Sequence, residues 1–255
     1  MAVPSETEAF DFVGSPPPSR FYVVCSTPRS GSTLLTRLLW RSGRMGAPHE
    51  YFNIQSVLFR MQLRFRSDSI HAYTDELLRR RTGPNGVFGF KLHQEHWHTF
   101  WYCGRFNVFR DLKYVRIRRR DRLAQAISLT IARQTGQWTS DVPAKAEPRY
   151  DFNQVRRALQ DLDRMERGWD SELTARKIKP LELVYEDFRN DTDSCVRAVC
   201  DFVGVDPNEP ATPVPLPELE RQTSPINREW TDRFKRDWDR HRAATAATGS
   251  APRSR

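Results

Sequence analysis

The stretch STPRSGSTLL, residues 26–35, predicts both the fold and the binding chemistry of this chain. It follows the apolar run RFYVVCS (20–26), which is typical of a strand covered on both faces. It leads into STLLTRLLWRSG (32–43), where leucines recur at helical spacing and Gly43 marks the end. A polar loop between such a strand and a helix presents free backbone amides and the positive end of a helix dipole. The sequence therefore predicts a strand–loop–helix unit that binds an anion.

The side chains of this loop strengthen the prediction of an anion site. Gly31 lets the backbone approach a ligand closely, and Arg29 adds a planar cation that suits phosphate or sulfate. Hydroxyl donors come from Ser30, Ser32 and Thr33. The loop of a P-loop nucleotide kinase reads Gly-x4-Gly-Lys-Ser/Thr, and this stretch has neither the first glycine nor the lysine. A nucleotide kinase is therefore an alternative that the loop does not favour.

Predicted strands and helices alternate along the rest of the chain. Three further apolar runs are predicted to be strands, at 86–92, 113–118 and 180–185. Apolar residues recur at helical spacing at 121–136, from Asn153 onward, at 193–204 and at 227–242. Such alternation predicts a P-loop-like, three-layer α/β fold with a mainly parallel central sheet flanked by helices.

The polar turns after the first three strands are expected to meet at one place. They cover residues 27–33, 91–98 and 118–128. Ligands of parallel sheets bind beyond the carboxyl ends of the strands, so these turns are predicted to form the binding site.

The chain has 255 residues, enough for one sizeable α/β domain, which we place at 20–240. Residues 1–19 contain four prolines and little to bury, so they are predicted to be a disordered lead-in. Residues 241–255 are of low complexity and are predicted to be a disordered tail.

The net charge of +9 favours an anionic ligand, nucleic acid or an acidic membrane surface. The basic run RIRRRDR (116–122) is interrupted by Ile117 and Asp121, which is more typical of a strand end than of a nucleic-acid-binding tail. We therefore expect no nucleic-acid partner. A non-catalytic anion- or nucleic-acid-binding protein remains the alternative from a different class.

Cysteine usage and the amino terminus bear on the compartment. The four cysteines include no Cys-x-x-Cys pair, which is typical of reduced thiols. The first residues show no basic region followed by an apolar core, and no apolar stretch is long enough to span a membrane. The expectation is a cytoplasmic protein without a transmembrane segment.

Several motifs resemble those of sulfotransferases and occur in the same order. STPRSGSTLL resembles their 5′-phosphosulfate-binding loop, whose common form is Pro-Lys-Ser-Gly-Thr-Thr, and LVYEDFRND (183–191) recurs among them. The stretch PRSGSTLLTRLLWRSGRMGAPHEYFN (28–53) is similar to the mycobacterial trehalose 2-sulfotransferase family. Further segments that resemble this family are GFKL (89–92), RRDRLAQAIS (119–128) and ERQTSPINREWTDRFKRD (220–237).

The resemblance implies a reaction and a donor. The chain would transfer a sulfuryl group from 3′-phosphoadenosine-5′-phosphosulfate (PAPS) to an acceptor hydroxyl, releasing 3′-phosphoadenosine-5′-phosphate (PAP) without a metal. Arg29 and residues 30–33 would hold the 5′-phosphosulfate. Arg29 would also stabilise the leaving phosphate, because an arginine keeps its charge and does not act as an acid.

The resemblance also assigns residues to the rest of the donor. Arg119 and Ser128 would bind the 3′-phosphate, and Arg118 or Arg120 could share this role. In the carboxyl-terminal match, the residues that would cover the nucleotide are Arg221 and Gln222.

On the acceptor side, Glu50 in the motif HEYF matches the catalytic glutamate of the family and is predicted to be the general base. The aromatic residues 51–52 beside it favour a raised carboxyl pKa, which suits a base. His49 is the substitute base. Lys91 matches the family's lysine at a strand end, which places it near the phosphosulfate or the acceptor.

The identity of the acceptor stays open. The resemblance implies a carbohydrate or glycolipid, such as a trehalose-like sugar, and a homodimer. Between the glutamate motif and the predicted strand that contains GFKL, the chain has only residues 53–86, fewer than family members have, so trehalose itself is not carried over. The stretch HQEHWH (93–98) imitates a metal cluster, but no fourth ligand with zinc spacing follows. We therefore predict structural or polar-rim histidines there and no metal site.

Overall fold

The computed structural model describes residues 6–102, 106–139, 142–206, 209, 211, 214 and 225–249. The chain forms two compact units. The first comprises Met1–Arg120 and Arg164–Glu218 and contains the sheet. The second comprises Asp121–Asp163 and Leu219–Arg255. The predicted anion-binding loop therefore lies in the first unit.

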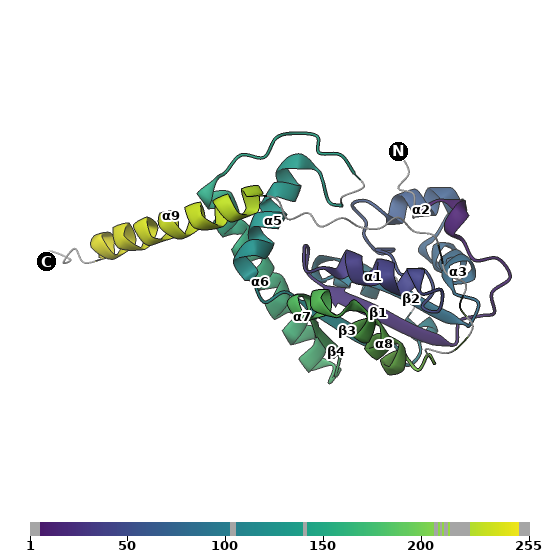
Figure 1. Ribbon diagram of the computed structural model, residues 1–255. Helices are drawn as coiled ribbons and strands as arrows, with labels where there is room; N and C mark the ends of the chain where they lie inside the picture. The colour runs from purple at the N-terminus through teal and green to yellow at the C-terminus, as the bar shows by residue number, and fades with distance from the viewer. Residues whose placement is uncertain are drawn as a thin grey trace, which may run out of the picture. The chain divides into compact units, whose positions relative to one another are not determined.

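Within the described residues, the sheet has four parallel strands in the order β2-β1-β3-β4 (Figure 1). The strands are β1 (Arg20–Ser26), β2 (Val87–His93), β3 (Lys113–Arg118) and β4 (Leu181–Val184). The register aligns Ser26, the last residue of β1, with His93 of β2 and Ile117 of β3. The carboxyl ends of these three strands therefore meet at one edge, and the predicted parallel sheet is confirmed.

Helices cover both faces of this sheet. Side chains of β1 point alternately to the two faces and enter two different apolar cores. Val23 and Cys25 belong to one core, and Tyr22 and Val24 belong to the other. The first core is covered by α2 (Leu58–Phe65), α3 (Ile70–Arg81), α4 (Trp97–Tyr102) and the end of α6 (Phe152–Ala175). The second is covered by α1 (Ser32–Arg41), α7 (Tyr185–Asn190) and α8 (Thr192–Val203). The predicted three-layer α/β architecture is confirmed. Short 3₁₀ turns are η2 (Glu8–Phe10), η3 (Gln94–His96) and η4 (Phe106–Val108).

The second unit is built from α5 (Arg122–Thr135), the beginning of α6, and α9 (Pro225–Gly249). Their apolar faces share a core that includes Ile127, Leu162 and Trp230. α9 continues through 241–249, where the sequence suggested a disordered tail; the alanines of this stretch favour a helix. No helix within the described ranges is long and apolar enough to cross a membrane.

Residues 6–12 contact the body of the first unit, although 1–19 were predicted to be a disordered lead-in. Glu6 is buried and forms an ion pair with Arg60 of α2, with Nη2 and Oε1 2.6 Å apart. Asp11 pairs with arginines of α2 and α3. The composition of the segment did not reveal these contacts, because each carboxylate finds its partner far away in the sequence.

Candidate active site

The loop after β1 is a tight turn with an unusual backbone. The Ser30 amide donates to the Thr27 carbonyl at 3.3 Å, which leaves Pro28 and Arg29 at the centre of the turn. Arg29 has a φ of 63°, in the left-handed region that few residues other than glycine adopt. Proline followed by a residue of positive φ is the pattern of a type II turn. An arginine held there marks the turn as a candidate for function.

Gly31 is required by its backbone and by its surroundings. It has a φ of 89° and lies directly before the first residue of α1. A Cβ at this position would overlap the ring of Tyr185 at the start of α7. The absence of a side chain therefore lets the loop pack directly on Tyr185. The first amides of α1, from Ser32 onward, have no partner within the helix and suit an anion.

Two arginines lie together at this loop. Arg119 Nη1 donates to the Arg29 carbonyl at 3.3 Å, and its guanidinium carbon lies 5.0 Å from the centre of the Tyr185 ring. Burial and then the charge of Arg119 lower the pKa of Arg29 to about 10. Neighbouring guanidinium groups repel one another, so an anion between them would be bound strongly.

The loop also contains a buried polar atom that a ligand would satisfy. Ser30 is fully buried, and its Oγ has no hydrogen-bond partner among the described residues. Leaving such a hydroxyl unpaired is unfavourable. A phosphate or sulfate oxygen would satisfy it, so the residues of the loop fit a phosphosulfate.

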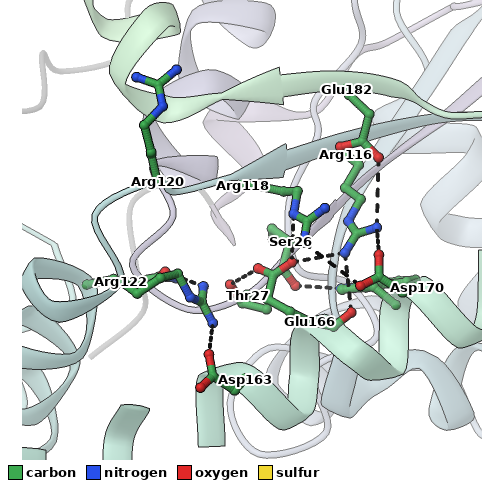
Figure 2. Close-up of polar contacts among 12 residues, drawn as sticks. Ser26, Thr27, Arg116, Arg118, Arg120, Arg122, Asp163, Glu166, Asp170 and Glu182 are labelled. Atoms are coloured by element: carbon green, nitrogen blue, oxygen red, sulfur yellow. Dashed lines mark hydrogen bonds and ion pairs between the residues drawn. The ribbon is translucent and has the colours of Figure 1, made fainter. Parts of the chain in front are cut away.

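Arg119 was assigned from the sequence, and a share of its role was left open for Arg118 or Arg120; the structure gives the three arginines different contacts. Arg118 Nε lies 3.2 Å from Glu166 Oε2, and Arg120 Nη2 donates to Asp187 Oδ2 at 2.8 Å. Figure 2 shows Arg118 directed toward Glu166 and Arg120 directed away from it. Of these three arginines, Arg119 is the one that contacts the loop at Arg29.

Lys91 connects Glu50 to the loop after β1. The Lys91 amide donates to the His49 carbonyl at 2.9 Å, which brings the glutamate segment alongside β2. Lys91 Nζ lies 2.6 Å from Glu50 Oε1 and donates to Thr33 Oγ1 at 2.9 Å. One lysine therefore joins the predicted base to the anion-binding loop.

The aromatic residues beside Glu50 suggested a raised pKa for its carboxyl group, but the structure gives a lowered one. Burial does raise it, but the charges and hydrogen bonds of Lys91 and His93 outweigh burial and hold the pKa well below its ordinary value. Asn53 Nδ2 donates to the second carboxylate oxygen at 2.8 Å. The prediction of a raised pKa was wrong because these partners could not be located from the sequence. Glu50 is ionised at neutral pH and can accept a proton.

His93 belongs to this site, although the sequence suggested a structural histidine. Its Nε2 lies 3.4 Å from Glu50 Oε1, and its Nδ1 shares a hydrogen bond of 2.9 Å with Ser26 Oγ. Because an ionised carboxylate only accepts hydrogen bonds, His93 Nε2 is the donor in this contact. The signal in the sequence was the pairing of two strand ends, which places Ser26 opposite His93.

The other predicted residues make other contacts, belong to the second unit or are not described. His49 Nε2 lies 3.5 Å from Glu6 Oε1, and its ring packs edge-on against Tyr51. Ser128 lies on α5 of the second unit. Arg221 and Gln222 lie outside the described residues.

The histidines of 93–98 do not gather around a metal position. Burial first, and then the charge of His93, lower the pKa of His96 to about 4, so its ring is neutral near pH 7. In the part of the chain that the structure describes, no group of three or more His, Cys, Asp or Glu side chains is arranged to hold a metal ion.

A strand–loop–helix unit predicted to bind an anion, with an adjacent carboxylate, is the arrangement expected of a group-transfer enzyme. The sequence model of the Stf0 sulphotransferase family matches residues 21–102 and 105–237, and the chain belongs to this family. The predicted resemblance is thereby confirmed. The protein is a sulfotransferase, and the alternatives of a binding protein or a nucleotide kinase are not favoured.

Two curated proteins are similar over most of their length. The trehalose 2-sulfotransferase of Mycobacterium tuberculosis (strain ATCC 35801 / TMC 107 / Erdman) is 28% identical over 85% of this chain and 94% of its own length. The trehalose 2-sulfotransferase of Mycolicibacterium smegmatis (strain ATCC 700084 / mc(2)155) is 26% identical over 86% and 96%.

Solved structures of two sulfotransferases also match, each at 15% identity. The sulfotransferase domain of the Synechococcus PCC 7002 olefin synthase has a TM-score of 0.45 and covers 88% of this chain and 98% of its own. A sulfotransferase from Alicyclobacillus acidocaldarius has a TM-score of 0.47 and covers 89% and 95%.

Proposed function

We propose that this enzyme transfers the sulfuryl group of PAPS to a hydroxyl of a carbohydrate or glycolipid, with Glu50 as general base. The observation that carries the proposal is the position of Lys91, which contacts both Thr33 of the anion-binding loop and the Glu50 carboxylate. The donor bound at the loop and the acceptor beside Glu50 would therefore come together next to Lys91. The family implies a sulfonate donor, and the names of the two curated relatives favour a sugar such as trehalose as acceptor.

The donor site is assigned to the loop and its neighbours. Arg29, Ser30 and the amides of 31–33 would bind the 5′-phosphosulfate, which supplies the activated sulfuryl group. Support comes from the unpaired Ser30 hydroxyl and the neighbouring charges of Arg29 and Arg119.

The residues that would bind the rest of the donor are assigned either from a contact in the structure or from sequence resemblance. Arg119 is proposed for the 3′-phosphate because it contacts the loop. The assignments that rest on sequence resemblance are Ser128 for the 3′-phosphate, and Arg221 and Gln222 for the nucleotide.

In the proposed reaction, Glu50 accepts the proton of the acceptor hydroxyl while that oxygen bonds to sulfur. The bond from sulfur to the 5′-phosphate oxygen breaks, and PAP leaves with the electron pair. Arg29 stabilises the charge that develops on the leaving phosphate. Lys91 balances the negative charge near the transferred group. An anionic donor beside Lys91 would also weaken its hold on Glu50 and make the carboxylate a stronger base.

Three further assignments are proposed. One family model spans described residues of both units, so we assign residues 20–240 to one sulfotransferase domain. Phe59 and Leu63 of α2 are exposed apolar side chains, and their exposed fractions of 61% and 79% favour a homodimer contact there. His49 would line the acceptor side, next to Glu50.

A transfer assay tests the proposed function. The protein is incubated with PAPS labelled in the sulfuryl group and a panel of trehalose, other disaccharides, glycolipids and simple alcohols. Labelled sugar or glycolipid together with an equal amount of PAP is the expected result. Transfer only to non-sugar alcohols would refute the proposed acceptor class, while PAP release without any acceptor would indicate hydrolysis.

A further inference from the structure

Glu166 on α6 connects the donor loop to the centre of the sheet. Its carboxylate is buried, and its two oxygens contact different parts of the fold. Oε1 accepts a hydrogen bond of 3.0 Å from Thr27 Oγ1, and Oε2 accepts one of 2.9 Å from Arg116 Nη2. Figure 2 shows the three side chains in this arrangement. The first residue of the loop is therefore tied to an arginine on β3.

Thr27 is fixed on both sides. Its hydroxyl donates to Glu166, while its carbonyl accepts the Ser30 amide that closes the turn around Arg29. A second bond supports the same place, because Trp169 Nε1 of α6 donates to the Ser26 carbonyl at 2.8 Å. α6 therefore holds two consecutive residues at the start of the loop.

The turn needs such support because Arg29 adopts a positive φ. A residue in this region is unfavourable by itself and persists only where the surrounding structure fixes it. The hydrogen bonds to Thr27 and Ser26 lie directly beside the turn and can supply that restraint.

The buried ion pair of Glu166 and Arg116 is not explained by its contribution to stability alone. Burying both charges is unfavourable, and apolar side chains of similar size often do as well. Arg116 is buried, and it also binds Asp170, with Nη1 and Oδ1 2.6 Å apart, on the half-exposed side of α6. Asp170 binds the same arginine as Glu166, but among the described residues its ion pairs are with arginines of β3 and not with the loop.

We propose that Glu166 is a positioning residue for donor binding, which holds Thr27, and through it Arg29, in the geometry that receives the phosphosulfate. The inference rests on the proposed assignment of the loop to the donor. It adds a residue of the long helix, far from the loop in the sequence, to the parts that determine donor affinity.

Thr27→Val and Thr27→Ser provide the first test. Valine keeps the shape of threonine and removes the donor to Glu166, and serine keeps the donor. PAP binding is measured by calorimetry and the Michaelis constants of donor and acceptor by kinetics. Thr27→Val should weaken PAP binding by about tenfold, the order expected for one hydrogen bond to a charged group. Thr27→Ser should retain most of the affinity, and the acceptor KM should not change in either variant.

Glu166→Gln and Asp170→Asn provide the second test and its matched control. Each removes one carboxylate charge beside Arg116, but Glu166→Gln also leaves a single oxygen for two donors, Arg116 Nη2 and Thr27 Oγ1, and so disturbs the loop. Glu166→Gln should weaken PAP binding to about the same extent as Thr27→Val, whereas Asp170→Asn should bind PAP like the unchanged protein. In the Glu166→Gln background, Thr27→Val should then have little additional effect. Thermal unfolding is followed in parallel so that lost folding is not mistaken for lost affinity.

The outcomes separate this inference from the proposed function. If the unchanged protein does not bind PAP, the donor assignment fails. If it binds PAP and Glu166→Gln binds equally well, the positioning role is refuted. If Thr27→Val weakens PAP binding as much in the Glu166→Gln background as in the unchanged protein, Thr27 acts without Glu166. That result would also refute the positioning role of Glu166.

Discussion

The Lys91 ammonium lies 2.6 Å from the Glu50 carboxylate, so the predicted general base is held as one half of an ion pair. The same ammonium contacts the Thr33 hydroxyl of the anion-binding loop. A change in charge at the loop can therefore be transmitted to Glu50 through one side chain. This relationship gives the pH dependence of the reaction a definite direction.

Lys91→Met should shift the acid limb of the activity profile to higher pH. Lys91 lowers the pKa of Glu50 and burial raises it, so removing the lysine leaves burial less opposed. The base would then stay protonated to a higher pH. The loss of a cation beside the transferred group should also reduce turnover by roughly 10², the range seen for lost transition-state donors. The measurement is kcat/KM against pH.

The matched control for this variant is Lys113→Met, because Lys113 is an exposed lysine at the start of β3. It should leave the profile unchanged. An acid limb that stays in place in Lys91→Met would show that Glu50 is not the group whose ionisation limits the rate.

Glu50→Gln should reduce turnover by roughly 10²–10⁴, the range typical of lost general acid–base catalysis. PAP affinity should stay within a factor of a few, since Glu50 faces the acceptor in the proposed site. His49→Ala is tested in parallel by the same steady-state kinetics. If His49→Ala stops turnover while Glu50→Gln keeps most of it, the base has been assigned to the wrong residue.

Glu50 should also contribute to stability in a pH-dependent way. Its pKa in the folded state lies well below its ordinary value near 4.5, so its contribution is present above that value and is lost as the pH falls through the folded-state pKa. The difference in free energy of unfolding between the unchanged protein and Glu50→Gln should therefore shrink below about pH 4.5. Denaturant titrations at several pH values measure it. A difference that is constant down to pH 3 would contradict the ion pair.

Gly31→Ala should both destabilise the fold and abolish PAP binding. The new Cβ would occupy a left-handed backbone position and overlap the Tyr185 ring, so the loop has to shift. Gly204→Ala is the matched control, since Gly204 has a φ of 82° and nothing within 4 Å of an added Cβ. It should lower stability by only about 1 kcal/mol and leave PAP binding intact. Equal PAP affinity in the two variants would show that the packing of the loop on Tyr185 is unimportant.

The fold could be predicted because its signals are local. Each strand is a short apolar run, and the loop at 27–33 combines glycine, arginine and hydroxyls within a few residues. The register of β1 and β2 then brings Ser26 and His93 together, as expected for parallel strands that end at one edge. The resemblance suggested only that Lys91 lies near the phosphosulfate or the acceptor; its contact with Glu50 is seen in the structure.

What could not be predicted depends on contacts between distant residues. Glu166 and Thr27 are separated by 139 positions, and no local pattern links them. The pKa of Glu50 was predicted in the wrong direction because burial, which raises it, is outweighed by its partners on β2, Lys91 and His93. The carboxylates of α6 and α7 that contact Arg118 and Arg120 also could not be located from the sequence.

Calorimetric titration with PAP and AMP, with Arg29→Ala as the comparison, tests the central claim most directly. The two ligands differ by the 3′-phosphate, which the proposed site recognises, and both carry the 5′-phosphate that the loop would bind. The unchanged protein should bind PAP far more tightly than AMP, and Arg29→Ala should weaken both. Equal affinities for PAP and AMP would contradict the 3′-phosphate site, and undiminished PAP binding in Arg29→Ala would contradict the role of the loop.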